Sequence, residues 1–445
     1  MDNALENQLH DLVAAARRAG ADAAEARASR GEQTSVTVRF GKIETVQREE
    51  PEGWGLRVWV GARSASLSSI DLGAKDARDA LVERTLFMAR SALEDPYGGL
   101  APAQIVRSTA EDDAEAALQL YDSTELNAAE LTDMARAAEA GALAVQGVAN
   151  SNGSQASAGV YQQWHVTSEG FVGRRCRSGF GHSISVIAGS GADGAMESGA
   201  YGQNTLWRED LAAPWSIGAE AGRRAVARVG SRKLASTRAP VIFERRMAMG
   251  ILRPFLGAID GAAVARGSSF LQRRLGERVF APGIRLMDDP TVVRGRGSRV
   301  VDGEGVPTTP RALIDDGFLT SWMLSVSSAR QLDLSPNGYG GTGPSNLTLE
   351  PGAASLTELM AGAGDGLLIT GMFGPSLNGQ TGDWSAGVDG FWFENGEIAY
   401  PVSEITVAGS LPDFYARMVV GADLRIEDAA NAPSLLIDAV TIGGR

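Results

Sequence analysis

Short apolar runs that end at glycine recur along the whole chain, and this pattern constrains the fold more than any other feature. The 55 glycines are scattered through 445 residues, as expected for many turns between short strands. Residues 34–50 alternate apolar and polar side chains about a turn at Gly41-Lys42, and residues 55–69 form a second such pair. Asn395-Gly396, between two apolar runs, is the strongest short hairpin signal. We therefore expect a chain rich in antiparallel strands.

Helical periodicity interrupts this pattern at several places. The N-terminal residues and residues 74–92, 127–143, 216–230 and 247–259 each place apolar side chains on one helical face. Ser216 is the expected N-cap of the fourth of these helices. The sequence predicts an α+β protein: an N-terminal domain (1–232, with possible sub-lobes 1–102 and 103–232) of antiparallel sheet with helices, and a β-rich C-terminal domain (233–445). Within the second sub-lobe, Glu169-Gly170 and Ser178-Gly179 are the expected turns.

Composition excludes several classes of function. Hydrophobic residues make up 44% of the chain, so a folded protein is expected. The net charge of −13 argues against nucleic-acid partners and against docking on an anionic membrane. A single cysteine, the absence of a long apolar span and the lack of a basic-then-apolar start together favour a cytoplasmic protein.

Histidines are scarce, which limits metal and nucleophilic chemistry. The three are His10, His165 and His182, and no two of them have the helical spacing of a zinc site. His165, Cys176 and His182 lie in consecutive expected strands, so a composite metal site is one alternative. Packed or solvated strand residues are the interpretation we favour.

Carboxylates offer a second candidate site. Asp302, Glu304 and Asp383 lie in glycine-rich segments, and paired carboxylates perform acid–base chemistry. Asp in such turns more often accepts backbone N–H groups, and this is the favoured interpretation. Residues 340–346 (GGTGPSN) form either a linker or the lip of a substrate groove.

Several long segments carry a family resemblance. They are EDPYGGLAP, SRKLASTRAPVIF, GILRPFLGAIDGAAVARGSSFLQRRLGE, VVDGEGVPTTPRALIDDGFLTSWMLSVSSARQLDL and TGDWSAGVDGFWFENGEIAYPVSEITVAG. On these segments the chain resembles the TldD/PmbA family and, within it, the PmbA branch, also called TldE. The resemblance spans the whole length, and the last three segments together are specific.

The resemblance implies a heterodimeric cytoplasmic peptidase that matures peptide antibiotics or removes a labile antitoxin. It implies that the TldD-type subunit carries an HExxxH helix, whose two His hold zinc and whose Glu activates water. At the matching positions this chain has Arg253, Pro254 and Ala258. The region of the later ligand, residues 425–435, holds neither Cys nor His. Pro254 also removes a helical hydrogen bond, so the helix is expected to kink or to begin there.

The chain is therefore expected to hold no cofactor, with zinc in a TldD-type partner. It would shape a chamber for unfolded peptides. Its groove or its subunit interface would be lined by Trp384, Phe391 and Trp392. The alternative for these three rings is a place in the core beneath the strands. Two other readings stay open: a peptide-binding homodimer, and a peptidase with its own carboxylate or metal site. The family's association with DNA gyrase does not imply direct nucleic-acid contact here, because the chain is acidic.

Overall fold

A curved antiparallel sheet forms the N-terminal half of the molecule. The computed structural model describes residues 3–70, 72, 74–109, 113–190 and 196–444. The sheet has seven strands in the order β4-β3-β1-β5-β6-β7, with β2 paired to β1. These strands are β1 (Ala23–Arg39), β2 (Lys42–Glu49), β3 (Glu52–Val60), β4 (Arg63–Ser69), β5 (Val148–Thr167), β6 (Val172–Ala188) and β7 (Glu197–Thr205).

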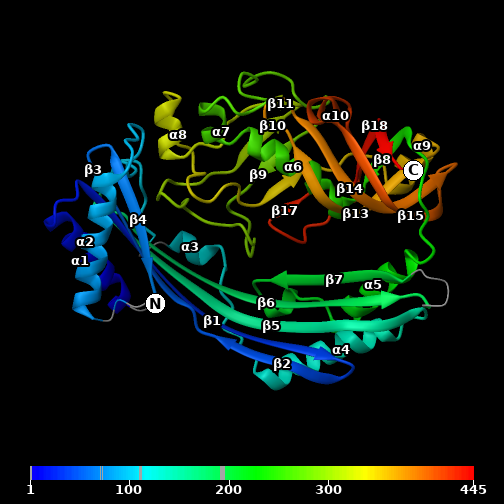
Figure 1. Ribbon diagram of the computed structural model, residues 1–445, viewed down its shortest axis with the longest axis horizontal. Coiled ribbons are helices and arrows are strands. Elements are labelled where there is room, and N and C mark those ends of the chain that lie inside the picture. The colour runs from blue at the N-terminus through cyan, green and yellow to red at the C-terminus, as the bar shows by residue number, and fades with distance from the viewer. Residues whose placement is uncertain (1–2, 71, 73, 110–112, 191–195, 445) are drawn as a thin grey trace.

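Three of these strands are unusually long, and they join the two expected sub-lobes. β1 pairs with β5 from Glu25↔Thr167 to Val38↔Ser154, and β5 pairs with β6 along almost its whole length. Residues 1–102 and 103–232 therefore contribute to one continuous sheet. Figure 1 shows β5, β6 and β7 running beneath the C-terminal half of the chain.

Helices cover the sheet at its two ends. α1 (Asn3–Arg18) and α2 (Lys75–Ser91) pack at one end, where Leu9, Leu12 and Leu56 lie in a shared core. α4 (Ala128–Leu143) and α5 (Pro214–Ala227) cover the other end, on the side away from the C-terminal half (Figure 1). The short α3 (Asp113–Ala117) precedes α4.

Local sequence signals place most helix and strand ends, and two expectations were wrong. Ser178 and Gly179 lie inside β6, because the Ser178 hydroxyl donates to the Leu206 carbonyl and accepts the Asp122 N–H instead of closing a turn. α5 begins at Pro214, whose fixed φ suits a first helical residue, so Ser216 lies within the helix.

The C-terminal half is built on a six-stranded sheet in the order β15-β14-β13-β8-β18-β16, which an additional β15–β18 pairing closes on itself. Its strands are β8 (Thr237–Phe243), β13 (Gly366–Leu377), β14 (Asp383–Glu394), β15 (Glu397–Ser410), β16 (Val419–Val420) and β18 (Leu435–Gly443). The Asn395-Gly396 hairpin joins β14 to β15, with both residues at positive φ, as expected.

A smaller sheet and five helices complete this half. The sheet has the order β11-β10-β9-β12-β17, from β9 (Leu286–Asp288), β10 (Arg311–Asp315), β11 (Phe318–Leu319), β12 (Leu347–Leu349) and β17 (Ala430–Asn431). The helices are α6 (Arg245–Ala258), α7 (Gly261–Ala265), α8 (Val326–Gln331), α9 (Leu356–Ala363) and α10 (Leu411–Arg417).

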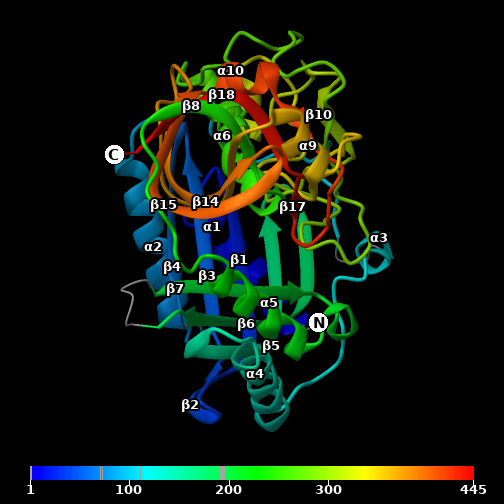
Figure 2. The same cartoon turned by 90° about the vertical axis from the view of Figure 1, so that its right-hand side faces the viewer.

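The largest core lies in this C-terminal half. It joins the apolar face of α6, through Ile251, Leu252 and Phe255, to strands of the closed sheet such as β8 and β14. Figure 2 shows α6 encircled by the strands of that sheet. These features confirm the α+β class. Within the part of the chain that the structure describes, no helix has the length and apolarity to cross a membrane.

Candidate functional site

The α6 helix carries the three positions that the resemblance singles out. It begins at Arg245, where the Glu244 side chain accepts the Arg246 N–H as an N-cap, and it runs on to Ala258. Of the two expectations for Pro254, a kink or a helix start, the helix start was therefore wrong. Proline costs a helical hydrogen bond, but Ile251 and Phe255 on either side of it are fully buried and hold the helix against the core.

The three positions differ in what they face. Arg253 is exposed and lines a cavity of about 770 Å³, which we call the α6 cavity. Pro254 is half-buried, and Ala258 is buried in the core. Neither proline nor alanine has a side-chain lone pair for a metal, and arginine stays protonated in proteins. The residues present at these positions do not fit a zinc ion.

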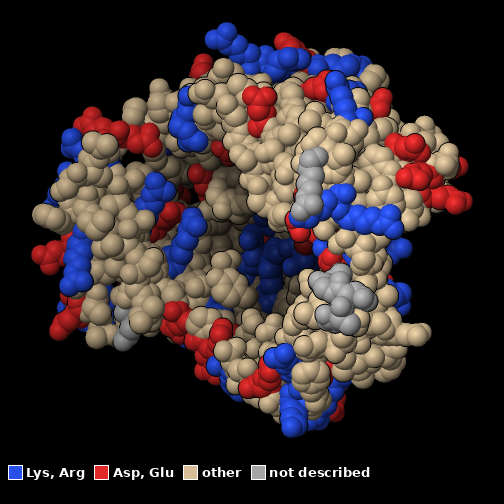
Figure 3. Space-filling view, turned by 45° about the vertical axis from the view of Figure 1, so that its right-hand side comes forward, with Lys and Arg blue, Asp and Glu red and all other residues tan. Residues whose placement is uncertain are grey.

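Six arginines line the α6 cavity, between β5–β7 of the large sheet, α6 and the segment before β17. They are Arg224, Arg245, Arg246, Arg253, Arg296 and Arg425. In the view of Figure 3, Lys and Arg side chains gather deep in a hollow between the two halves of the molecule. This concentration of positive charge contrasts with the net charge of −13 for the whole chain.

Four of these arginines have carboxylate partners. Arg245 and Arg296 contact Glu427 and Asp428, each at 2.7 Å. Arg246 lies 2.7 Å from Glu244, and Arg224 lies 2.8 Å from Glu220. The carboxylates of the segment that corresponds to the later zinc ligand are thus engaged by guanidinium groups.

The sheet does not bring His165, Cys176 and His182 together. His165 on β5 pairs with Gly173 on β6, so Cys176, three residues further along, lies on the opposite face. His182 follows Cys176 by six residues, which is about 20 Å of strand. Among the described residues, no group of three or more His, Cys, Asp or Glu is placed to hold a metal.

Each member of that trio has its own surroundings. His165 Nε2 donates to the Glu25 carboxylate at 2.8 Å, and burial lowers the pKa of His165. Burial also raises the pKa of the Cys176 thiol and lowers the pKa of His182 to about 4. Burial alone would raise the pKa of Glu25, but the His165 hydrogen bond and Arg27 outweigh it and hold that pKa at about 2.

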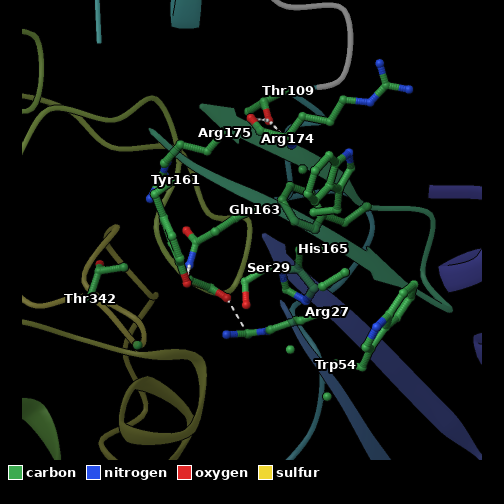
Figure 4. Close-up of a pocket in the computed structure, with 18 of the residues that line it drawn as sticks. Arg27, Ser29, Trp54, Thr109, Tyr161, Gln163, His165, Arg174, Arg175 and Thr342 are labelled. Carbon is green, nitrogen blue, oxygen red and sulfur yellow. Dashed lines mark hydrogen bonds between the residues drawn. The ribbon is translucent and has the colours of Figure 1, made fainter. Parts of the chain in front are cut away.

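A second cavity, of about 790 Å³, lies beside His165, on the face of the large sheet that carries the His165 side chain (Figure 4). We call it the β5 cavity. Its polar side chains include Arg27, Tyr161, Gln163, His165 and Arg175, and Trp54 and Trp164 also line it. Gly341 and Thr342 of the 340–346 loop lie at its rim.

Asp302 lines the β5 cavity, but its carboxylate is occupied by the backbone. It accepts the N–H groups of Glu304, Val306 and Gly340 at 2.8, 3.0 and 2.7 Å, and its side chain is buried. Asp302 therefore closes its own turn and fastens that turn to the 340–346 loop. This is the backbone-capping role that the glycine-rich sequence favours.

Glu304 lies two residues on, under the same loop. Its carboxylate accepts the N–H of Val326, the first residue of α8, at 2.7 Å. Burial, together with the nearby Asp302 and Glu25 carboxylates, raises the pKa of Glu304 to about 7 against the opposing effects of that hydrogen bond and of Arg27. Glu304 is thus a carboxyl group that titrates near neutral pH.

This titration makes stability depend on pH. As pH rises, the folded state keeps the Glu304 proton to a higher pH than the unfolded chain does. The contribution of Glu304 to the free energy of unfolding is therefore fully present below pH 4.5, and it is lost as pH rises through about 7. A rise in pKa from 4.5 to about 7 corresponds to about 3 kcal/mol. Glu304→Gln keeps an amide oxygen that can accept the Val326 N–H but removes the titrating group. Between pH 5 and pH 8 we therefore expect the free energy of unfolding to fall less in this variant than in the unsubstituted protein. Urea titrations at both pH values measure the difference, and parallel pH profiles would contradict the assignment.

The aromatic residues of β14 are placed differently from one another. Trp384 is buried in the largest core, between Phe243 and Phe414, so the groove interpretation was wrong for this ring and strand core is correct. Phe391 and Trp392 are half-buried and pack against two different cores. Asp383 is exposed and accepts a hydrogen bond from Thr381. None of these residues lines the α6 cavity or the β5 cavity.

Sequence reasoning missed most arginines of the α6 cavity and the Glu25–His165 pair beside the β5 cavity. The α6 cavity takes its arginines from four separate segments, and the Glu25–His165 pair joins β1 to β5 across 140 residues. The sequence signals were local: the Arg245-Arg246 pair at the start of α6 places two like charges together, and the RIED segment at 425–428 places an arginine near two carboxylates.

Comparison with known proteins covers the whole chain. Residues 24–89, 121–229 and 236–444 match the models for domain 1, the central domain and the C-terminal domain of the PmbA/TldA metallopeptidases. The metalloprotease PmbA of Escherichia coli O157:H7 is 34% identical over 95% of this chain and 93% of its own length. The PmbA homologue of Haemophilus influenzae is 33% identical over 97% of this chain and 94% of its own.

Solved structures share the fold. A Bacteroides thetaiotaomicron protein described as a candidate modulator of DNA gyrase superposes with a TM-score of 0.91 at 26% identity, covering 99% of both chains. TldE of Thermococcus kodakarensis superposes with a TM-score of 0.82 at 17% identity, over 99% of this chain and 100% of its own. The domain matches and the full-length identity to PmbA agree with the segments that first suggested the relationship, and we conclude that this chain belongs to the PmbA/TldD metallopeptidase family.

Proposed function

We propose that this chain is the non-catalytic, PmbA-type subunit of a two-subunit peptidase. It pairs with a zinc-bearing TldD-type homologue and shapes a chamber that admits unfolded peptides. The observation that carries the proposal is α6, which keeps its place in the core but presents Arg253, Pro254 and Ala258 instead of metal ligands.

Ligand chemistry supports the absence of a hydrolytic centre on α6. A zinc peptidase needs imidazole or carboxylate ligands and a base that activates water. The carboxylates near Arg253, namely Glu427 and Asp428, are paired with Arg245 and Arg296. Zinc, when bound in the TldD-type partner, would supply the Lewis acid, and this chain would supply walls and peptide contacts.

The sheet offers a place for an extended peptide. β7 is the last strand of the large sheet, and residues 200–204 of it line the α6 cavity. Ala200 and Gly202 are exposed and small, so the strand's main chain is accessible there. Main-chain pairing at such an edge is tolerant of sequence, which suits unfolded substrates.

Relatedness supports a homologous partner. The TldD homologue of Haemophilus influenzae is 28% identical over 212 residues, 42% of this chain. Two chains of one family provide the similar surfaces from which a pseudo-symmetric dimer is built. A homodimer that binds peptide without cutting it is the rival assembly.

Reconstitution tests the proposal. An unfolded peptide is incubated with this chain, with a TldD-type homologue, and with the mixture, each with and without a chelator. We expect cleavage in the mixture to exceed that of either chain by at least about tenfold, and the chelator to abolish it. Chelator-sensitive cleavage by this chain alone would refute the non-catalytic assignment.

Light scattering on the same samples separates the two assemblies. A complex with the mass of one copy of each chain supports the heterodimer. A homodimer that does not exchange with the TldD-type chain would contradict it.

A further inference from the structure

Two of the six arginines in the α6 cavity have no partner. Arg253 on α6 and Arg425 before β17 are both exposed, and neither guanidinium group makes a hydrogen bond or ion pair with any residue that the structure describes. The other four arginines already hold the nearby carboxylates Glu220, Glu244, Glu427 and Asp428. The cavity therefore keeps an excess of positive charge.

We propose that the α6 cavity is a carboxylate-binding site that selects acidic peptide segments through Arg253 and Arg425. This site would give the proposed function a preference for acidic substrates. It rests on the proposed function in one respect, which is that the ligand is a peptide. The guanidinium group is a planar fork of N–H donors that matches a carboxylate in two parallel hydrogen bonds. Two unpartnered forks in one cavity suit an Asp or Glu side chain or a C-terminal carboxylate.

The surroundings fit a peptide better than a nucleic acid. Tyr201 lines the cavity, but Arg224 covers one face of its ring at 4.1 Å, so that face is not free to stack on a base. The chain as a whole carries a charge of −13, which repels a long polyanion from the approach to the cavity. A short acidic peptide carries few charges, and β7 lies along the same wall.

Arg253 and Arg425 have different supports, which makes their roles separable. Arg253 projects from a helix whose opposite face is buried, so its base is rigid. Arg425 belongs to the segment before β17, which Arg245 and Arg296 tie down through Glu427 and Asp428. The paired arginines thus position the segment that presents an unpaired one.

Fluorescence anisotropy on this chain alone, without the partner, tests the inference. The probes are a short labelled unstructured peptide ending in aspartates, the same peptide with asparagines, and each with a C-terminal amide. We expect the aspartate peptide to bind best and its affinity to fall with added salt. Binding kept in the amidated aspartate peptide assigns side-chain carboxylates, and binding lost on amidation assigns the C-terminus.

Matched variants locate the site. Arg253→Gln with Arg425→Gln is expected to weaken binding of the aspartate peptide about tenfold or more and to leave the amidated asparagine peptide, which has no carboxylate in its tail, unchanged. Arg273→Gln is the control, because Arg273 is exposed, has no partner among the described residues and lies outside the cavity. Circular dichroism melts confirm that the variants fold.

Three results would overturn the inference: no binding of the aspartate peptide, equal binding by the double variant, or displacement of the peptide by a single-stranded oligonucleotide that binds more tightly. Because cleavage is not measured, a failure here leaves the reconstitution result to decide the proposed function independently.

Discussion

Gly218→Ala is expected to destabilise the protein by about 3 kcal/mol or more, since overpacking against immobile atoms lies at the upper end of such costs. A Cβ at Gly218, in α5, would lie 1.7 Å from the Ala138 carbonyl oxygen of α4. That oxygen belongs to a helix backbone and cannot rotate away. The two helices must separate, and their shared core around Ala142, Ile217 and Ala221 opens with them.

Urea unfolding of Gly218→Ala measures the loss, and Gly257→Ala is its matched control. Gly257 also lies within a helix, α6, but a Cβ there meets no atom within 4 Å. The control is expected to gain up to about 1 kcal/mol from helix propensity. Equal stability of the two variants would show that the α4–α5 contact is looser than described.

Asp302→Ala is expected to cost about 3 kcal/mol or more, because each buried donor left unsatisfied costs about 1–3 kcal/mol. One carboxylate serves the N–H groups of Glu304, Val306 and Gly340, and alanine replaces none of these bonds. The 340–346 loop would lose its attachment to the turn, and the rim of the β5 cavity would lose its shape.

Asp383→Ala is the control for this second prediction. The Asp383 side chain is exposed, and its carboxylate accepts a hydrogen bond from Thr381, so its replacement by alanine is expected to change stability by less than about 1 kcal/mol. Differential scanning calorimetry compares the two. A stable Asp302→Ala variant would reopen an acid–base role for this carboxyl group.

Local signals predicted much of the fold. The Asn395-Gly396 hairpin forms as its dipeptide indicates, because both residues of the turn adopt positive φ. The helices at residues 74–92 and 127–143 also form, the second with a full capping box at Asn127. These features depend on neighbours within a few residues.

Features that depend on distant residues were beyond the sequence. Ser178 and Gly179 resemble a turn, but β5 pairs with both residues, and on the other side the Ser178 N–H donates to the Leu120 carbonyl. Arg425 and Arg253 are 172 positions apart, and only the packing of the segment before β17 beside α6 places them in one cavity. The family resemblance located the altered α6 positions but not the arginines that surround them.

The long β1–β5 pairing has a consequence for how the chain is made. Glu25 pairs with Thr167, 142 positions later, so one edge of β1 stays open while the ribosome adds the intervening residues. At about 5–20 residues per second, that interval is on the order of ten seconds. β2 and β3 protect the other edge early, since they follow β1 directly. The nascent chain therefore presents an unpaired strand edge to the cell for longer than folding of a local hairpin requires, and newly made protein is the form most exposed to aggregation and to chaperones.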